Sequence, residues 1–408
     1  MGAKGVSNWR LFCIYAALLL MFFPCALLYS YPYPGRELAA LVAWTFAFPS
    51  SIGLAVLCLF PVLPNETYGY SAFNLLCVVA TMASGIGAFR LLDANPELWH
   101  RLYRFVMCCM VVSLLLAFWQ GFDGERWMEA FPMMWALGGG RGGGLRTEPS
   151  LLACPLAVYL SMALFRCKEK DFRGKEVKHP IREVIVIALA TLVLTRSLTV
   201  AIVLFCFLPV FTTKLRYLFA SGAVGALLGA AVFWDRIRDA LPEGGTFTYL
   251  ITTDVKSWRN IPDILILANV RDYLLPSNPA GIRDKLNFLA TMWNPGLAWL
   301  INTYSTFSAS ATTIGVIVTA IVFGAGLLVG ARKIPHASHM RATWFLLYIA
   351  DWFILPKYEV SGWVALGLLT AIASKVYQTE TNPTPEAASS ADRKFSSDNA
   401  GCGVPECS

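Results

Sequence analysis

The sequence predicts an all-α integral membrane protein with about eleven transmembrane helices (roughly ten to twelve), because its composition suits a bilayer and not water. Of the 408 residues, 56% are hydrophobic and only 14% are charged, whereas about 25% of the residues of a soluble domain are charged. So few charges cannot cover so much apolar surface in water. The apolar residues also gather in runs close to the length that crosses a bilayer as a helix. Composition therefore excludes a soluble globular domain and a disordered chain.

The expected spans are the apolar runs of the chain. They cover about 11–30, 38–63, 71–90, 102–120, 149–165, 183–195, 198–213, 217–234, 306–330, 342–355 and 361–376. A long loop at about 235–305 separates the eighth span from the ninth and holds two short candidate helices. Residues 1–376 therefore form one membrane domain. Residues 377–408 are rich in Ser, Thr, Pro and acidic residues, and we expect them to form a disordered cytoplasmic tail.

The distribution of Lys and Arg among the short loops predicts which side of the membrane each loop faces. Loop 166–182 is strongly basic, so it is placed in the cytoplasm; its basic residues are Arg166, Lys168, Lys170, Arg173, Lys175, Lys178 and Arg182. Loop 121–148, the long loop and the turn between the sixth and seventh spans then face the outside. Two indications disagree about the N-terminus. Lys4 and Arg10 predict the cytoplasm, whereas counting spans back from the basic loop predicts the outer side.

A glycine-rich stretch with two arginines, residues 138–150, lies in an outer loop just before the fifth span. It reads Gly-Gly-Gly-Arg-Gly-Gly-Gly-Leu-Arg-Thr-Glu-Pro-Ser. Glycines adopt backbone conformations closed to other residues, so successive N–H groups can converge on an anion as a nest. Arg141 and Arg146 add planar donor forks that suit phosphate oxygens, and Pro149 is suited to open the next helix. The alternative is a flexible glycine loop with solvated arginines.

Further arginines occur in the other outer loops. Arg196 interrupts the apolar run 183–213, within Leu-Thr-Arg-Ser-Leu-Thr, where it either faces a wet cavity or reaches water from a plain turn. The long loop carries Arg236, Arg238, Arg259, Arg271 and Arg283 among matching aspartates. Most of these charges form solvated Arg–Asp pairs in the simplest interpretation. Because positive charge is depleted in outer loops, arginines there indicate an anionic ligand, and a lipid-linked pyrophosphate would satisfy them.

The order of these motifs resembles a known family. The run Arg141-x-x-Gly144-x-x-x-Glu148-Pro149-Ser150, then Leu-Thr-x-Ser-x-Thr from Leu194, then a long outer loop, is similar to the bacterial O-antigen and exopolysaccharide polymerases of the Wzy type. These proteins belong to the O-antigen ligase/polymerase superfamily. The resemblance covers the order of elements over about 140–376. In that family an Arg often follows the Ser of the second motif, whereas here the Arg precedes the Ser.

The resemblance implies an inverting, metal-independent glycosyltransferase without a cofactor, at the periplasmic face of the bacterial inner membrane. It would polymerise undecaprenyl-pyrophosphate-linked repeat units into a surface polysaccharide (O-antigen, capsule or exopolysaccharide), with undecaprenyl pyrophosphate as leaving group. The partners it implies are these lipid-linked glycans, membrane lipid, and a chain-length regulator and flippase of the same pathway, with no nucleic acid. In keeping with this, the outer loops contain no carboxylate cluster that looks like a metal site.

The residues expected to be catalytic are Arg141, Arg259 and Glu148. Fixed arginines would stabilise the pyrophosphate as it leaves. Glu148 either accepts the proton of the acceptor hydroxyl or pairs with an arginine, and other candidates for the base are Asp254, Asp263 and Asp272. The residues expected to bind the substrate are Arg146, Arg196, Ser150, Ser197, Thr199, Arg271 and Arg283. The hydroxyl residues of this set either line the site or cap helices.

Three other functions are compatible with many spans and basic outer loops. One is an O-antigen ligase that transfers the glycan to the lipid A-core, another is a lipid-linked glycan flippase, and a third is a scaffold subunit without chemistry. The related ligases use a His in their large outer loop, whereas the histidines here, His100, His179, His336 and His339, all fall in predicted cytoplasmic loops. A transporter would be expected to show internal repeats, and none is evident. Both observations favour the polymerase.

Overall fold

The structure of the chain is a computed structural model, and it describes residues 7–23, 84–95, 97–130, 141–146, 149–173, 181–211, 332, 339–353 and 360–381. Every regular element within these residues is a helix, and they contain no strand. The all-α prediction is therefore confirmed for this part of the chain. The expected spans 38–63, 217–234 and 306–330 and the long loop 235–305 lie outside it, so the number of spans stays a prediction.

The helices follow the predicted spans closely. They are α1 (Asn8–Phe22), a helical stretch at 84–94, α6 (Leu98–Phe122), α7 (Gly124–Ala130), the 3-10 helix η2 (Pro149–Leu152), α8 (Ala153–Arg173), α9 (Ile181–Thr195), α10 (Leu198–Phe211), α19 (His339–Phe353) and α20 (Val360–Thr381). The short helix α7 lies in a predicted loop and was not expected. α20 also continues past residue 376, where the membrane domain was expected to end.

Among the described residues, one helix is long and apolar enough to cross a membrane by length and composition, namely α6. Its 25 residues extend over about 37 Å at 1.5 Å per residue, compared with about 30 Å for the hydrocarbon core of a bilayer. Shorter apolar helices occur at Asn8–Phe22, Pro149–Leu164, Leu198–Val210 and Val360–Ser374. The length and composition of α6 support an association of the chain with a membrane.

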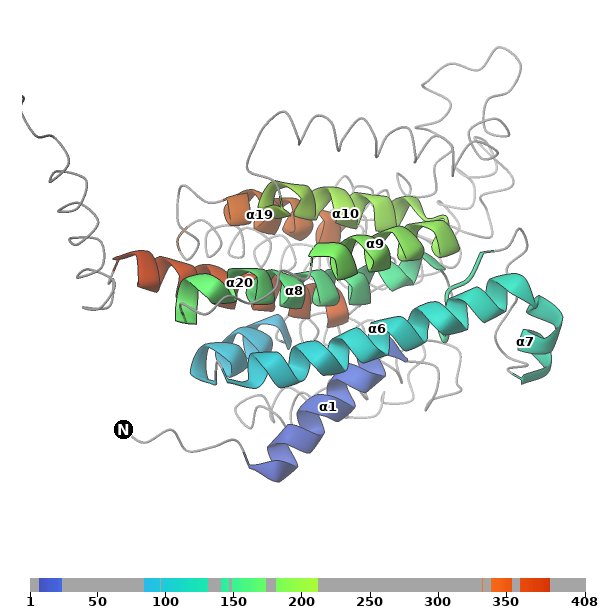
Figure 1. The fold of residues 1–408 in the computed structure, drawn as a ribbon, viewed down its shortest axis with the longest axis horizontal. Helices are drawn as coiled ribbons and strands as arrows, with labels where there is room; N and C mark the ends of the chain where they lie inside the picture. The colour runs from blue at the N-terminus through green and yellow to red at the C-terminus, as the bar shows by residue number, and fades with distance from the viewer. Residues whose placement is uncertain are drawn as a thin grey trace, which may run out of the picture.

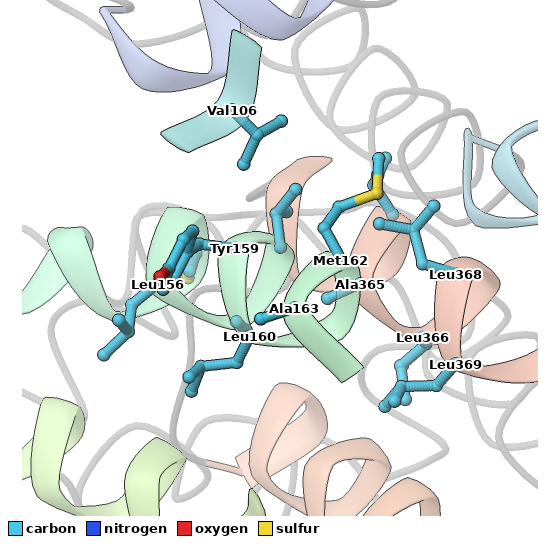
Figure 2. Packing of buried hydrophobic residues seen from close by; sticks show 14 of the residues in the cluster. Val106, Leu156, Tyr159, Leu160, Met162, Ala163, Ala365, Leu366, Leu368 and Leu369 are labelled. Atoms are coloured by element: carbon cyan, nitrogen blue, oxygen red, sulfur yellow. The ribbon is translucent and has the colours of Figure 1, made fainter. Parts of the chain in front are cut away.

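The helices pack as a bundle around α8 (Figure 1). Residues 153–164 of α8 are all buried, and this helix contacts α6, α10 and α20. The Ser161 hydroxyl donates to the Ala157 carbonyl in its own helix and, at 3.3 Å, to the Ala365 carbonyl of α20. Figure 2 shows Ala163 of α8 next to Ala365 of α20, with Val106 of α6 directed toward the same cluster.

Large apolar side chains also cover outward faces of the bundle. On α6 and α9 they include Val111, Leu115, Phe118, Phe122, Ile185, Val186, Leu189 and Val193. A soluble monomer rarely exposes a contiguous apolar surface of this kind, and an apolar interior together with an apolar exterior is what a lipid environment favours.

Two glycines let the backbones of distant helices touch. A Cβ at Gly367 of α20 would fall on the Gly85 carbonyl oxygen, well inside van der Waals distance. A Cβ at Gly85 would lie 2.5 Å from the Trp363 carbonyl oxygen. Small residues permit such close approach between helices in membranes, and the helical stretch 84–94 is seated on α20 by this contact.

The direction of α1 relative to α6 bears on the two indications about the N-terminus. The C-terminal end of α1 lies beside residues 141–151, because the Arg146 guanidinium donates to the Met21 carbonyl. α1 and α6 run in the same direction, with the Tyr15 and Phe105 rings 4.7 Å apart (Figure 1). Both helices therefore begin at the end of the bundle opposite residues 141–151. With the start of α6 on the cytoplasmic side, as the basic loops predict, this direction agrees with the expectation from Lys4 and Arg10. The number of spans between α1 and α6 and the side of the membrane that each end faces stay predictions.

Replacing Gly367 with Ala should lower the free energy of unfolding by about 1–3 kcal/mol, because the new methyl group meets backbone atoms that cannot rotate away. Thermal unfolding of the detergent-solubilised protein measures this. Gly121→Ala, at a half-buried position of α6, is the control and should be neutral or slightly stabilising, because alanine favours a helix over glycine. Equal melting temperatures for the two variants would contradict the close contact.

Candidate functional site

The two predicted motifs meet at one end of the bundle. The Gly142 N–H donates to the Leu194 carbonyl at 3.0 Å, and Arg141 Nε donates to the Thr195 carbonyl at 3.1 Å. These hydrogen bonds join the glycine–arginine loop, residues 141–146, to the last turn of α9 across more than fifty positions of sequence. The structure therefore brings Arg141 next to the Leu-Thr-x-Ser-x-Thr motif.

The end of α9 explains why these carbonyl groups accept hydrogen bonds from the loop. Arg196 adopts a left-handed conformation with φ 45°, which stops the helix. Its N–H still donates to the Leu192 carbonyl at 2.9 Å. The carbonyl groups of the last turn have no partner within a helix, and the Arg141 side chain and the Gly142 N–H supply one to each of two of them. The guanidinium also lies at the negative end of the helix dipole, which favours a cation.

The other side of the glycine–arginine loop is held by Gln120 of α6. Gln120 Oε1 accepts hydrogen bonds from the Gly143 N–H at 2.6 Å and from the Gly144 N–H at 3.0 Å. Gln120 is buried. Two successive N–H groups thus converge as a nest predicts, but the acceptor is an oxygen of this chain rather than a bound anion. Gln120 was not predicted to belong to the site. The feature of the sequence that could have indicated it is an amide side chain near the end of an apolar span.

Glycine is needed here because the loop lies against the backbone of α6. Gly144 has φ +63°, in the left-handed region, and a Cβ there would lie 3.0 Å from the Ser113 carbonyl oxygen. A Cβ at Gly142 would fall on the Ala117 carbonyl group, well inside contact distance. The glycines therefore provide close approach to a helix, in a conformation fixed on both sides, rather than a freely flexible loop.

Arg146 lies deeper than the other arginines of the site. Its side chain is 1% exposed, and its guanidinium donates to the Leu151 carbonyl at 3.0 Å and to the Met21 carbonyl. It therefore ties the glycine–arginine loop to the C-terminal end of α1 and to η2. We expected Arg146 to bind substrate, and the structure gives it main-chain partners inside the protein.

The remaining predicted residues of the described chain lie around the same junction. Arg196 is exposed and Arg141 is half-buried, whereas Ser197 and Thr199 are buried at the start of α10. Ser150 is half-buried in η2, which packs against α8, α9 and α10. Other predicted site residues lie outside the described residues, and these are Glu148, Asp254, Arg259, Asp263, Arg271, Asp272 and Arg283.

Metal ligands do not gather in the part of the chain that can be described. Within it, no three His, Cys, Asp or Glu side chains come close enough to hold a metal ion. The cationic groups toward the outside of the candidate site are the guanidinium groups of Arg141, which is half-buried, and of Arg196, which is exposed. Such donors bind anions, and phosphate in particular.

A second buried polar position lies away from this junction. Asp351 of α19 is 2% exposed, and its carboxylate lies so close to Gly362 of α20 that a Cβ there would clash with it. An ionisable residue inside an apolar helix is costly. A single acidic residue in the predicted span 342–355 was the signal that sequence reasoning did not use.

Comparison with known proteins adds no relative to these observations. Neither a protein-family model, nor a curated protein, nor a solved structure matches the chain.

Replacing Arg146 with Ala should destabilise the protein by about 3 kcal/mol or more, because buried carbonyl groups lose hydrogen bonds from a charged donor. The measurement is the melting temperature and the yield of folded protein in detergent. Arg196→Ala is the matched control, since this arginine is exposed and surface changes stay within about 0.5 kcal/mol. A stable Arg146→Ala protein would contradict the assignment of Arg146 as a residue that ties elements together.

Proposed function

We propose that the chain is a bacterial polysaccharide polymerase of the Wzy type. It transfers a growing glycan from undecaprenyl pyrophosphate to a hydroxyl of the next lipid-linked repeat unit. The products are a longer lipid-linked glycan and free undecaprenyl pyrophosphate. The reaction lies at the periplasmic face of the inner membrane, in a protein of about eleven transmembrane helices.

One observation carries the proposal, namely the hydrogen bond from Arg141 Nε to the Thr195 carbonyl. It joins the two motifs on which the resemblance depends, and it fixes a partly exposed guanidinium at one end of the bundle. Arg196 lies at the same end and is exposed. A cation that is already oriented stabilises developing negative charge without the cost of reorganisation.

The chemistry needs such a cation where the leaving group departs. The acceptor hydroxyl oxygen attacks the anomeric carbon. The bond from that carbon to the pyrophosphate oxygen breaks, and its electron pair stays on the pyrophosphate. The hydroxyl proton passes to a base, for which Glu148 is the candidate. Arg141 contacts the pyrophosphate oxygens in this proposal, joined by Arg196 and by Arg259, Arg271 and Arg283 of the long loop. Ser150 of η2, Ser197 just before α10 and Thr199 of α10 support the site in this proposal.

The membrane setting is supported by α6 and by the outward faces of α6 and α9. α6 is long enough to cross a bilayer, and large apolar side chains cover its exposed surface. Arg101, Arg104 and Arg182 are exposed at the end of the bundle opposite Arg141, which suits a cytoplasmic side for that end. The candidate site then faces the periplasm.

Replacing Arg141 with Ala should reduce polymer formation by about a hundredfold or more, the usual effect of removing one donor to a charged transition state. In bacteria that carry this variant, long chains should vanish from the surface while single repeat units still reach it. Gel sizing of the surface polysaccharide measures this. Arg141→Lys should restore little activity, because an ammonium cannot bond the Thr195 carbonyl and a phosphate through one planar fork.

Arg126→Ala is the matched control, because Arg126 lies at the same end, on α7, is 79% exposed and pairs only weakly with Asp123. It should leave chain length unchanged. Normal polymer in the Arg141→Ala strain would overturn the proposal. Repeat units retained on the cytoplasmic side would identify a flippase, and normal polymer that never joins the lipid A-core would identify a ligase. Purified protein with a defined undecaprenyl-pyrophosphate repeat unit tests the reaction directly.

Cysteines placed at 126 and 196 should react from the periplasm with a membrane-impermeant maleimide, whereas cysteines at 101 and 182 should react only after the membrane is permeabilised. The reason is that the first pair lies at the Arg141 end of the bundle and the second pair at the opposite end. The unmodified protein, with its own cysteines, gives the background. Labelling of positions 141 and 259 from opposite faces of the membrane would rule out a shared site.

A further inference from the structure

Gln120 occupies the position inside the glycine–arginine loop where a nest binds its ligand. Its Oε1 atom accepts from two successive N–H groups, those of Gly143 and Gly144, and the side chain is 3% exposed. A buried amide oxygen that accepts two hydrogen bonds is a fixed part of the protein rather than a surface group that a ligand displaces. The sequence motifs and the proposed reaction leave this residue without a role.

The close contact between the loop and α6 explains why an acceptor is needed at this position. Gly142 and Gly144 lie against the carbonyl groups of Ala117 and Ser113. The N–H groups of Gly143 and Gly144, which face α6, are therefore shielded from water. A buried N–H without an acceptor costs about 1–3 kcal/mol. An amide oxygen satisfies both groups without the cost of a buried charge.

The loop is held at three points around Arg141. Gln120 Oε1 accepts from the N–H groups of Gly143 and Gly144. The Leu194 carbonyl accepts from the Gly142 N–H, and the Thr195 carbonyl accepts from Arg141 Nε. Arg141 therefore lies between the last turn of α9 and the amide of α6. If the α6 side of this arrangement is released, the backbone at 142–144 can shift, and the guanidinium no longer meets the end of α9 at its present angle.

We propose that Gln120 is a positioning residue, which holds the glycine–arginine loop so that the Arg141 guanidinium faces the leaving pyrophosphate. The proposal rests on the polymerase function proposed above. Gln120 itself does not touch the substrate, and its effect passes entirely through Arg141. In this assignment the glycines are needed because the loop must fit between the Gln120 side chain of α6 and the last turn of α9.

Three variants separate this role from a general effect on folding. Gln120→Leu removes the acceptor. Gln120→Glu keeps a carbonyl oxygen at the same reach, because burial favours the protonated, uncharged carboxyl group. Ser113→Ala is the matched control. It removes another buried hydrogen bond of α6, from the Ser113 hydroxyl to the Cys109 carbonyl at 2.9 Å, and leaves the acceptor of the loop in place.

The first measurement is hydrogen exchange of peptides that contain residues 141–146, in the purified full-length protein. Gln120→Leu should speed exchange roughly three- to tenfold for each amide that loses its hydrogen bond. Gln120→Glu and Ser113→Ala should leave the exchange of these peptides close to that of the unmodified protein. Unchanged exchange in Gln120→Leu overturns the inference whatever the activity, because the loop would not depend on the amide oxygen.

The second measurement is polymer formation from a defined lipid-linked repeat unit, with equal amounts of folded protein. Gln120→Leu should lower polymer formation toward the level of Arg141→Ala, and Gln120→Glu should recover most of it. The double variant should be no worse than Arg141→Ala alone, because residues that act as one unit are not additive.

The two measurements distinguish failure of the inference from failure of the proposed function. Faster exchange with normal polymer in Gln120→Leu, while Arg141→Ala is inactive, overturns the positioning role. A double variant much worse than Arg141→Ala also overturns it, since Gln120 would then act by another route. Normal polymer in Arg141→Ala overturns the polymerase proposal itself, and the positioning role in polymerisation falls with it, whatever the exchange of the loop shows.

Discussion

The carbonyl groups at the end of α9 are the constraint on which the candidate site depends. A helix leaves its last carbonyl groups without partners, and in an apolar surrounding each such group needs a donor. Here the Gly142 N–H and Arg141 Nε supply them. The same contacts that complete the helix therefore fix the backbone and the side chain of the arginine. The site is a consequence of how one helix ends.

The inside of the bundle makes this arrangement rigid. α8 is buried along residues 153–164 and packs against both α6 and α20. Arg146 joins the glycine–arginine loop to α1 and η2. The glycine–arginine loop is thus bound to carbonyl groups of α1, η2 and α9. Because these carbonyl groups are part of ordered helices, the loop that binds them is held in one conformation. In the proposed polymerase, such order would set the orientation of the Arg141 guanidinium before the substrate arrives.

Much of the helical pattern could be predicted from the sequence, because long apolar runs need helices in any apolar surrounding. α6, α8, α9 and α10 begin or end within a few residues of the predicted spans, apart from the extension of α8 to Arg173. The glycine–arginine stretch was predicted to form a nest, and its N–H groups do converge. The acceptor could not be predicted, since Gln120 lies more than twenty residues away and periodicity says nothing about which distant side chain faces a loop. The direction of α1 and the burial of Arg146 depend on one another through the Met21 carbonyl, and neither follows from local pattern.

The contact between Gly85 and Gly367 sets an order of assembly for the chain. These residues are separated by most of the polypeptide, and a ribosome adding about 5–20 residues per second needs roughly 15–60 s to go from one to the other. Through that interval the helical stretch 84–94 exists without the backbone surface on which it finally rests. Until α20 is made, the backbone at Gly85 has no Trp363 carbonyl group to pack against. The packing of the helical stretch 84–94 is therefore complete only after α20, the last helix of the described chain, has been made.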